Sequence, residues 1–169
     1  ATGWFVVAMS AMILSAVTDL FDGYFARKFN VVTRIGGYLD PLTDKVFYLT
    51  AFPMLVYLAG LRDDFLHARL LLALAILFLL RDQWVSFLRS VGALYNVDAK
   101  ANWSGKARTL ISFPVICLVF YYLEAPKTWN FLPIELIYVA EAASMAINLI
   151  SIWVYTVYYW PWIKKEMAD

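Results

Sequence analysis

Long runs of residues without charge divide this chain. They cover residues 1–18, 46–61, 70–80, 110–123 and 142–163. A helix needs about 20 predominantly apolar residues to cross a bilayer, and 70–80 reaches that length when it continues through Arg81 to Tyr95. The pattern therefore predicts five membrane-spanning helices, at about 2–25, 37–60, 66–94, 107–123 and 132–162.

The same pattern predicts the fold class. No stretch alternates polar and apolar residues over the ten or so positions of a membrane β-strand, and only helices and closed barrels can satisfy their backbones in lipid. We predict an all-α, polytopic integral membrane helix bundle that forms a single domain over residues 1–169. Pro133 and Pro161 are expected to mark the two ends of the last helix.

Composition supports a membrane protein and excludes other classes. The chain is 63% hydrophobic and 16% charged, whereas soluble domains are about 45–50% apolar and 25% charged. Disorder is excluded because 18% of the residues are aromatic. With 14 Lys and Arg against 13 Asp and Glu, no basic excess suggests a nucleic-acid partner. Cys117 is the only cysteine, so there is no disulfide framework.

The basic residues predict the orientation. One set of predicted loops carries eight of them: Arg27, Lys28, Arg34, Lys100, Lys106, Arg108, Lys164 and Lys165. The opposite set carries only Arg62, Arg69 and Lys127. By the positive-inside rule the first set is cytoplasmic. Ala1 would then begin on the far side, with five crossings in this chain. The chain does not begin with Met, so the alternative of six crossings, with a further helix upstream, stays open.

Four aspartates within 26 residues lie near the cytoplasmic ends of the first two predicted helices: Asp19, Asp22, Asp40 and Asp44. Residues three or four apart share one face of a helix, so each pair presents its carboxylates together. Four converging carboxylates would repel one another or take up protons. Divalent cations with a preference for oxygen ligands relieve that repulsion, and Mg²⁺ or Mn²⁺ fits best.

Two other interpretations of the aspartates remain open. In the first, they are helix caps and interfacial charges; this explains any single one well, but not all four at this spacing. In the second, the chain is a divalent-cation transporter that uses them as a passage. A transporter would need carboxylates deep in the bilayer on more than two helices, whereas these cluster near one surface.

The residues around the aspartates form a longer motif. Residues 19–44 fit the pattern D-x2-D-G-x2-A-R-x8-G-x3-D-x3-D. In every fixed position this resembles the signature of the CDP-alcohol phosphatidyltransferase family, integral membrane enzymes of phospholipid synthesis. The resemblance implies a CDP-linked lipid as donor, an alcohol as acceptor and CMP as leaving group.

The resemblance also implies roles for the motif residues. Asp19, Asp22 and Asp40 would hold a pair of divalent ions, and Asp44 would accept the proton of the acceptor hydroxyl while also contacting a metal. The nucleotide would be bound by Gly23, Ala26, Arg27 and Gly36. The small residues let a base and ribose approach the backbone, although helix packing also explains them. His67, the only histidine, lies in the opposite loop, which favours direct transfer over a covalent intermediate.

Residues beside the last two aspartates resemble one branch of the family. Pro41 and Lys45 look like the phosphatidylglycerophosphate synthases and the related cardiolipin synthases. We therefore expect CDP-diacylglycerol as donor and glycerol 3-phosphate as acceptor. The alternative is a cardiolipin synthase that uses phosphatidylglycerol as acceptor. Members of the family are often homodimers, so a dimer in the membrane is expected as well.

Basic residues further along favour an acceptor that carries a phosphate. Asp82, Ser86 and Arg89 share one stripe of the third predicted helix, directly after Arg81. Lys106 follows in a Trp-x-Gly-Lys stretch. Both stretches resemble parts of phosphatidylglycerophosphate synthases, so we predict that Arg81, Arg89 and Lys106 bind the acceptor phosphate. The alternative is structural, with an ion pair between Asp82 and Arg89 and a basic interfacial loop.

The last helix carries no residue to which we assign chemistry. Its aromatic residues are typical of a belt at the membrane surface: Trp153, Tyr155, Tyr158, Tyr159, Trp160 and Trp162. Glu135 and Glu141 have no role that the resemblance supplies. They are expected to pair with interior arginines or to face lipid headgroups.

Overall fold

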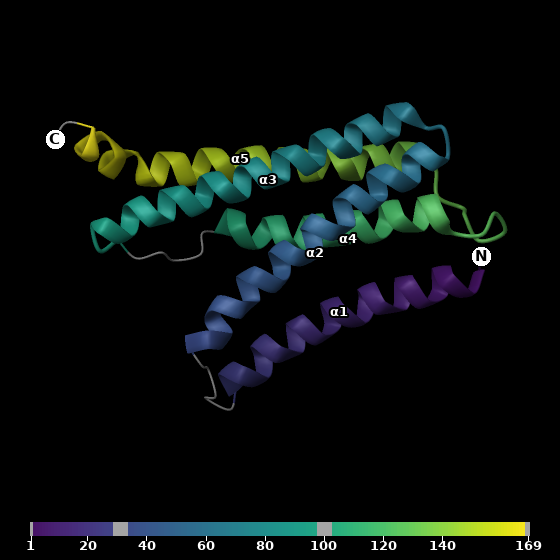
Figure 1. The fold of residues 1–169 in the computed structure, drawn as a ribbon, viewed down its shortest axis with the longest axis horizontal. Helices are drawn as coiled ribbons and strands as arrows, with labels where there is room; N and C mark the ends of the chain where they lie inside the picture. The colour runs from purple at the N-terminus through teal and green to yellow at the C-terminus, as the bar shows by residue number, and fades with distance from the viewer. Residues whose placement is uncertain (1, 29–33, 98–102, 168–169) are drawn as a thin grey trace. The chain divides into compact units, whose positions relative to one another are not determined.

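The structure is a computed structural model of the chain. It describes the backbone of residues 2–28, 34–97 and 103–167. Within these ranges the description leaves out the side chains of residues 2, 16–17, 19–28, 34–44 and 166. Five helices contain most of the described residues (Figure 1): α1 (Thr2–Lys28), α2 (Arg34–Leu61), α3 (Phe65–Leu94), α4 (Trp103–Glu124) and α5 (Ile134–Glu166). The described residues contain no strand, so the all-helical prediction is confirmed for them.

Helix ends depart from the prediction at several places. α2 begins at Arg34 and α4 at Trp103, three and four residues before the expected starts. Pro161 was expected to end the last helix, and that prediction is wrong, because α5 continues through it to Glu166. A proline inside a helix leaves the carbonyl four residues earlier without its partner. Here that residue is Val157, which is 55% exposed in the last part of the helix.

Two helices end in the same way. Asp63 has a φ of 58° and Asn96 a φ of 53°. After α2, the Asp64 amide bonds to the Ala59 carbonyl at 3.2 Å, and after α3 the Val97 amide bonds to the Gly92 carbonyl at 3.0 Å. These are the bonds of a helix that closes on a left-handed residue, a position in which Asn and Asp are tolerated.

The helices belong to two compact units. Unit 1 contains α1, α2 and the second half of α4, and unit 2 contains most of α3, the first half of α4 and α5. The core of unit 1 is aromatic: the Phe5 ring stacks on Phe120 with centroids 6.0 Å apart and meets Trp129 edge-on. In unit 2, Val85 and Leu88 of α3 pack with two buried tyrosines of α5, and the two helices run side by side (Figure 1).

Three of the helices could span a membrane. Within the described residues, α3, α4 and α5 are long and apolar enough, and the apolar stretches described in α1 and α2, Gly3–Ser15 and Lys45–Leu61, are shorter. Large apolar side chains such as Leu110 and Val139 are exposed on these helices, as expected where lipid surrounds them.

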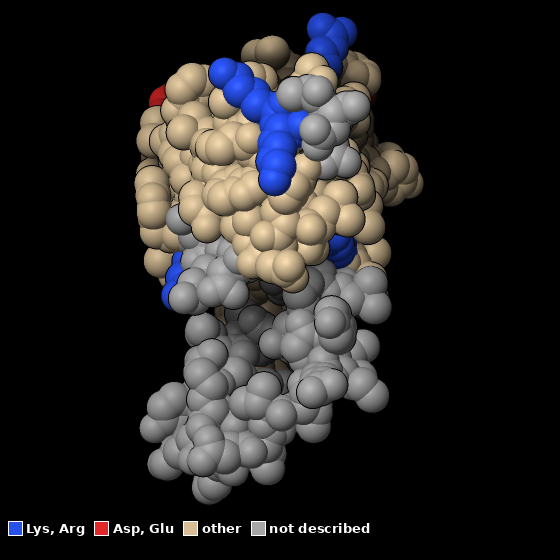
Figure 2. Space-filling view, turned by 90° about the vertical axis from the view of Figure 1, so that its left-hand side faces the viewer, with Lys and Arg blue, Asp and Glu red and all other residues tan. Residues whose placement is uncertain are grey.

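Figure 2 views the end at which α3 and α5 finish. Lys and Arg gather there, and acidic atoms are scarce on the described part of this face.

Candidate functional site

The aspartate motif lies on two helices of unit 1. Asp19 and Asp22 belong to α1, and Asp40 and Asp44 belong to α2. Both helices run without a break through these positions, so each pair shares one helical face. The side chains of all four aspartates, and of Gly23, Ala26, Arg27 and Gly36, lie outside the described residues. Their predicted metal and nucleotide contacts therefore stay predictions.

Unit 2 contains a second group of charged residues, which the structure describes in full. We call Arg81 and Arg89 of α3 and Arg108 of α4 the arginine cluster. Arg81 and Arg108 are each only 6% exposed. A buried ionised group must be compensated by hydrogen bonds and opposite charge, and within a membrane segment it is a candidate for function.

Arg81 is held from two helices. Its Nε and Nη2 donate to the Ser151 hydroxyl of α5 at 3.0 and 2.7 Å. Its Nη1 donates to Oδ1 of the neighbouring Asp82 at 3.1 Å. The guanidinium carbon also lies 5.3 Å from the centroid of the Tyr155 ring, within the range of a cation–π contact. The side chain therefore has a fixed position within the bundle.

Asp82 is shared between two arginines. Arg108 Nη1 donates to the same Oδ1 that accepts from Arg81. The Arg108 guanidinium also lies 4.1 Å from the centroid of the Phe78 ring. One carboxylate thus ties α3 to α4 and partly neutralises two guanidinium groups.

Arg89 completes the cluster through Tyr155. Its Nη2 donates to the tyrosine hydroxyl at 3.0 Å, and its guanidinium carbon lies 5.5 Å from the ring centroid. Its Nε is buried, and among the described residues that atom has no hydrogen-bond acceptor. A buried N–H donor without a partner is costly, and an anion bound at this position would satisfy it.

Gly105 allows α4 to pass close to this group. A Cβ placed on Gly105 would lie 3.1 Å from the Tyr155 hydroxyl and 3.7 Å from Nη2 of Arg81. The first distance is tighter than an ordinary van der Waals contact, so a larger residue would press on the tyrosine. The absence of a side chain at this position keeps Tyr155 where both arginines contact it.

The charge of this region suits an anion. Arg81 and Arg108 both form ion pairs with the carboxylate of Asp82. Two guanidinium groups share this one carboxylate, and Arg89 bonds to the neutral hydroxyl of Tyr155. Arginine presents several N–H donors in a plane, a geometry that matches the oxygens of phosphate. The arrangement can bind a phosphate group within a membrane bundle.

Comparison with known proteins identifies the family. The profile described as CDP-alcohol phosphatidyltransferase matches residues 1–158, nearly the whole chain and all of the aspartate motif. The chain belongs to the CDP-alcohol phosphatidyltransferase family. The predicted resemblance is thereby confirmed.

Relatives within the CDP-alcohol phosphatidyltransferase family share one name. The CDP-diacylglycerol–glycerol-3-phosphate 3-phosphatidyltransferase of Rickettsia bellii is 37% identical over 99 residues, which are 59% of this chain and 50% of the relative. The enzyme of that name from Shigella flexneri serotype 5b is 29% identical over 135 residues, 78% of this chain and 69% of the relative. For the first relatives, such as that of Blochmanniella floridana with 48%, the match spans about half of their length.

The structure brings together two of the three residues predicted to bind acceptor phosphate in this family member. Arg81 and Arg89 both contact Tyr155. Lys106 is exposed on the first turn of α4, and its predicted role is not tested. The described ion pairs of Asp82 are formed with Arg81 and Arg108, in place of the predicted alternative pair with Arg89.

Sequence reasoning missed Arg108, Ser151 and Tyr155. Arg108 was counted only as a topology charge, although it falls inside the predicted fourth helix. Tyr155 and Tyr159 were assigned to a surface belt, and that prediction is wrong because each is only 1% exposed. The spacing of the residues on α5 could have indicated their burial. Residues 151, 155 and 159 are four apart and therefore share one face of α5, and that face is buried.

Proposed function

We propose that this chain transfers a phosphatidyl group from CDP-diacylglycerol to glycerol 3-phosphate, forming phosphatidylglycerophosphate and CMP. Family membership and the name that its relatives share support this assignment. The observation that carries it is the buried arginine cluster of unit 2. A neutral alcohol would not require three guanidinium groups inside a membrane bundle, whereas an acceptor with a phosphate would.

The aspartate motif is assigned to the donor. Carboxylate oxygens are the ligands that Mg²⁺ and Mn²⁺ prefer, and two oxygen-rich helical faces on α1 and α2 fit such ions. Asp19, Asp22, Asp40 and Asp44 would hold two of them. When bound, the ions neutralise the diphosphate of the donor. Gly23, Ala26, Arg27 and Gly36, which interleave with the aspartates, would contact the nucleotide.

Asp44 is proposed as the base. The acceptor hydroxyl gives its proton to the Asp44 carboxylate, and the hydroxyl oxygen bonds to the phosphorus next to diacylglycerol. The bond from that phosphorus to the bridging oxygen breaks, and CMP leaves with the bridging oxygen. No group on the protein becomes covalently attached, so the transfer is direct.

The acceptor phosphate is assigned to the arginine cluster. Ser151 and Asp82 fix Arg81, and Tyr155 fixes Arg89, so the donors are positioned before the anion arrives. The unpaired Nε of Arg89 supplies one donor that the protein does not use. Lys106 would add a charge near the start of α4.

The proposal includes an orientation. All five helices would cross the membrane, with the active site at the cytoplasmic face and a homodimer as the working form. The Lys and Arg on the described part of the face at which α3 and α5 finish (Figure 2) support this orientation, because basic residues accumulate on the cytoplasmic side.

A purified-enzyme assay tests the assignment. We expect Mg²⁺-dependent CMP release from CDP-diacylglycerol when glycerol 3-phosphate is supplied, and little when it is replaced by glycerol. Release with phosphatidylglycerol but not with glycerol 3-phosphate would show a cardiolipin synthase instead. Metal flux into sealed vesicles without CMP release would show a transporter. Arg81→Met should raise the KM for glycerol 3-phosphate, whereas exposed Arg69→Met, on the same helix, serves as the matched control.

A further inference from the structure

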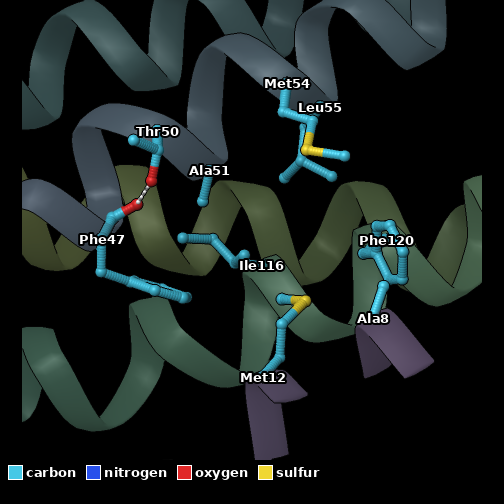
Figure 3. Close-up of a pocket in the computed structure, with 9 residues that line it drawn as sticks. All are labelled: Ala8, Met12, Phe47, Thr50, Ala51, Met54, Leu55, Ile116 and Phe120. Carbon is cyan, nitrogen blue, oxygen red and sulfur yellow. Dashed lines mark hydrogen bonds between the residues drawn. The ribbon is translucent and has the colours of Figure 1, made fainter. Parts of the chain in front are cut away.

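The interiors of the two units differ in how their polar atoms are satisfied. In unit 1, nine residues of α1, α2 and α4 line an apolar pocket of about 200 Å³ (Figure 3): Ala8, Met12, Phe47, Thr50, Ala51, Met54, Leu55, Ile116 and Phe120. The only hydroxyl among them is that of Thr50, which bonds to backbone carbonyls of its own helix, to Val46 at 3.0 Å and to Phe47 at 2.9 Å. This pocket therefore leaves no lining hydroxyl in need of a ligand.

Unit 2 contains a buried polar stripe on α5. Ser144, Asn148 and Ser151 are each fully buried, and their spacing of four and three residues places them on one face of the helix. Asn148 Nδ2 donates to the Ser144 carbonyl at 2.7 Å. Asn148 Oδ1 is also buried, and it has no hydrogen-bond donor among the described residues. A buried amide oxygen without a donor is costly, so this atom indicates that a donor binds here.

Two contacts define how α4 packs against α5. The Ser112 hydroxyl of α4 lies 3.2 Å from the Ser144 hydroxyl of α5. Earlier on α4, a Cβ placed on Gly105 would lie 3.1 Å from the hydroxyl of Tyr155, which comes later on α5. Residue numbers therefore fall along one helix as they rise along the other, and the two helices run antiparallel at this contact.

Arg108 lies on α4 at the level of Asn148. It precedes Ser112 by four residues, and Asn148 follows Ser144 by four. In an antiparallel pair, both residues then lie about one turn from the two serines in the same direction. Arg108 is buried and donates from Nη1 to Asp82. A guanidinium group has five N–H donors, and this carboxylate oxygen takes one of them.

We propose that a buried water bridges the Arg108 guanidinium and Asn148 Oδ1. A ligand at this place must accept from a cation and donate to an amide oxygen. The guanidinium would repel a metal ion, and a carboxylate has no hydrogen to donate. An uncharged hydroxyl compound does both, and water is the smallest. Buried waters make about three hydrogen bonds to such polar groups, and the Ser112 hydroxyl, on the Arg108 face of α4, is the third partner.

This water holds Arg108 from α5, as the Ser151 hydroxyl holds Arg81. Its role rests on the proposed function, because Arg108 belongs to the cluster that is assigned to the acceptor phosphate. A guanidinium group that is fixed before the anion arrives loses less freedom on binding. Asn148 is thus a positioning residue, which acts on the acceptor through Arg108.

A high-resolution structure of the purified chain without substrate tests the water directly. We expect an ordered water within about 3.2 Å of both Asn148 Oδ1 and an Arg108 nitrogen. It should be lost in Asn148→Val and kept in Asn148→Thr, because these side chains have nearly the same shape and only threonine has a hydroxyl. Three results would overturn the bridge: no density, a direct bond between Arg108 and Asn148, or density only after glycerol 3-phosphate is added, which would identify a hydroxyl of the acceptor.

The affinity for inorganic phosphate tests the positioning role without turnover. Asn148→Val should weaken phosphate binding about three- to tenfold, as expected for the loss of one hydrogen bond to a charged group. Asn148→Thr should bind phosphate like the native chain. Calorimetric titration is the measurement, and Ala146→Val, at an exposed position of α5, is the control. A lower melting temperature of Asn148→Val at unchanged phosphate affinity would show a merely structural role and refute the positioning role.

The water bridge and the proposed function fail separately. An ordered water in a native chain that releases no CMP would refute the proposed reaction and leave the bridge standing. CMP release with glycerol 3-phosphate from a native chain without the water would refute the bridge alone. A native chain that does not bind phosphate would refute the assignment of the arginine cluster and, with it, the positioning role of Asn148.

Discussion

The two units of this chain place opposite kinds of surface inside a membrane protein. Unit 2 buries Arg81 and Arg108 almost completely and Arg89 in part. Unit 1 surrounds its pocket with methionine, aromatic and aliphatic side chains. Both surfaces are built on helices of similar mean hydrophobic character, so bulk hydropathy does not distinguish them.

The difference shows how much each surface reveals about function. Burying a guanidinium group is expensive unless each donor is compensated. Asp82, Ser151 and Tyr155 accept hydrogen bonds from the arginines, and the donor that remains without an acceptor indicates an anionic ligand. Burying apolar side chains requires no such compensation, so the pocket specifies only hydrocarbon. The charged site therefore indicates a chemical group, whereas the pocket indicates a class of ligand. Substitutions in each unit should separate donor effects from acceptor effects.

The largest effect is expected in unit 1, at the proposed base. Asp44→Asn should lower kcat for CMP release by about 10²- to 10⁴-fold, the usual contribution of general-base catalysis. The KM for glycerol 3-phosphate should change little, since unit 2 retains its arginines. Asp64→Asn, on an acidic residue outside the motif, is the control, and steady-state kinetics is the measurement. Full activity in Asp44→Asn would refute the role of this residue.

A smaller effect is expected in unit 2, where Arg108 and Lys106 can be compared directly. Arg108→Met should raise the KM for glycerol 3-phosphate at least about thirtyfold, because truncating one member of a buried charge pair is strongly unfavourable. Lys106→Met should raise it only a few-fold, since an exposed cation contributes little. The KM for CDP-diacylglycerol should stay the same in both variants. A larger effect at Lys106 than at Arg108 would contradict the assignment of the buried cluster.

The sequence predicted the helices well because their signal is local. Runs without charge gave five helices, and the observed α3 begins and ends within one residue of the prediction. Pro161 was misjudged because a proline near the end of a helix disrupts only one hydrogen bond. The family, too, was predicted, because eight residues of the motif stand at fixed spacing within 26 positions.

The site was predicted only where a charge stood out against an apolar helix. Arg81 and Arg89 are conspicuous in this way. Arg108 is not, because it follows a basic loop and looks like a topology signal. Ser151 and Tyr155 carry no charge, and their contacts join residues about 70 positions apart along the chain. Such pairings depend on which faces of α3 and α5 meet, and one sequence does not contain that information.

The smallest predicted effect tests how unit 2 holds its arginines. Tyr155→Phe removes the hydroxyl that accepts from Arg89 but keeps the ring that both guanidinium groups approach. A hydrogen bond to a charged group contributes about 1.5–3 kcal/mol, and part of that is recovered when the anion binds. We therefore expect a three- to tenfold rise in the KM for glycerol 3-phosphate, with kcat unchanged.

A second variant separates the contribution of the Tyr155 ring from that of its hydroxyl. Tyr155→Leu removes the ring as well and should raise the KM further, because both cation–π contacts are lost. Tyr158→Phe, on the exposed side of α5, should behave like the native chain. If Tyr155 served only to pack the helices, Tyr155→Phe would lower thermal stability without shifting the KM. A KM that rises at constant melting temperature therefore shows that the tyrosine positions the arginines for the acceptor.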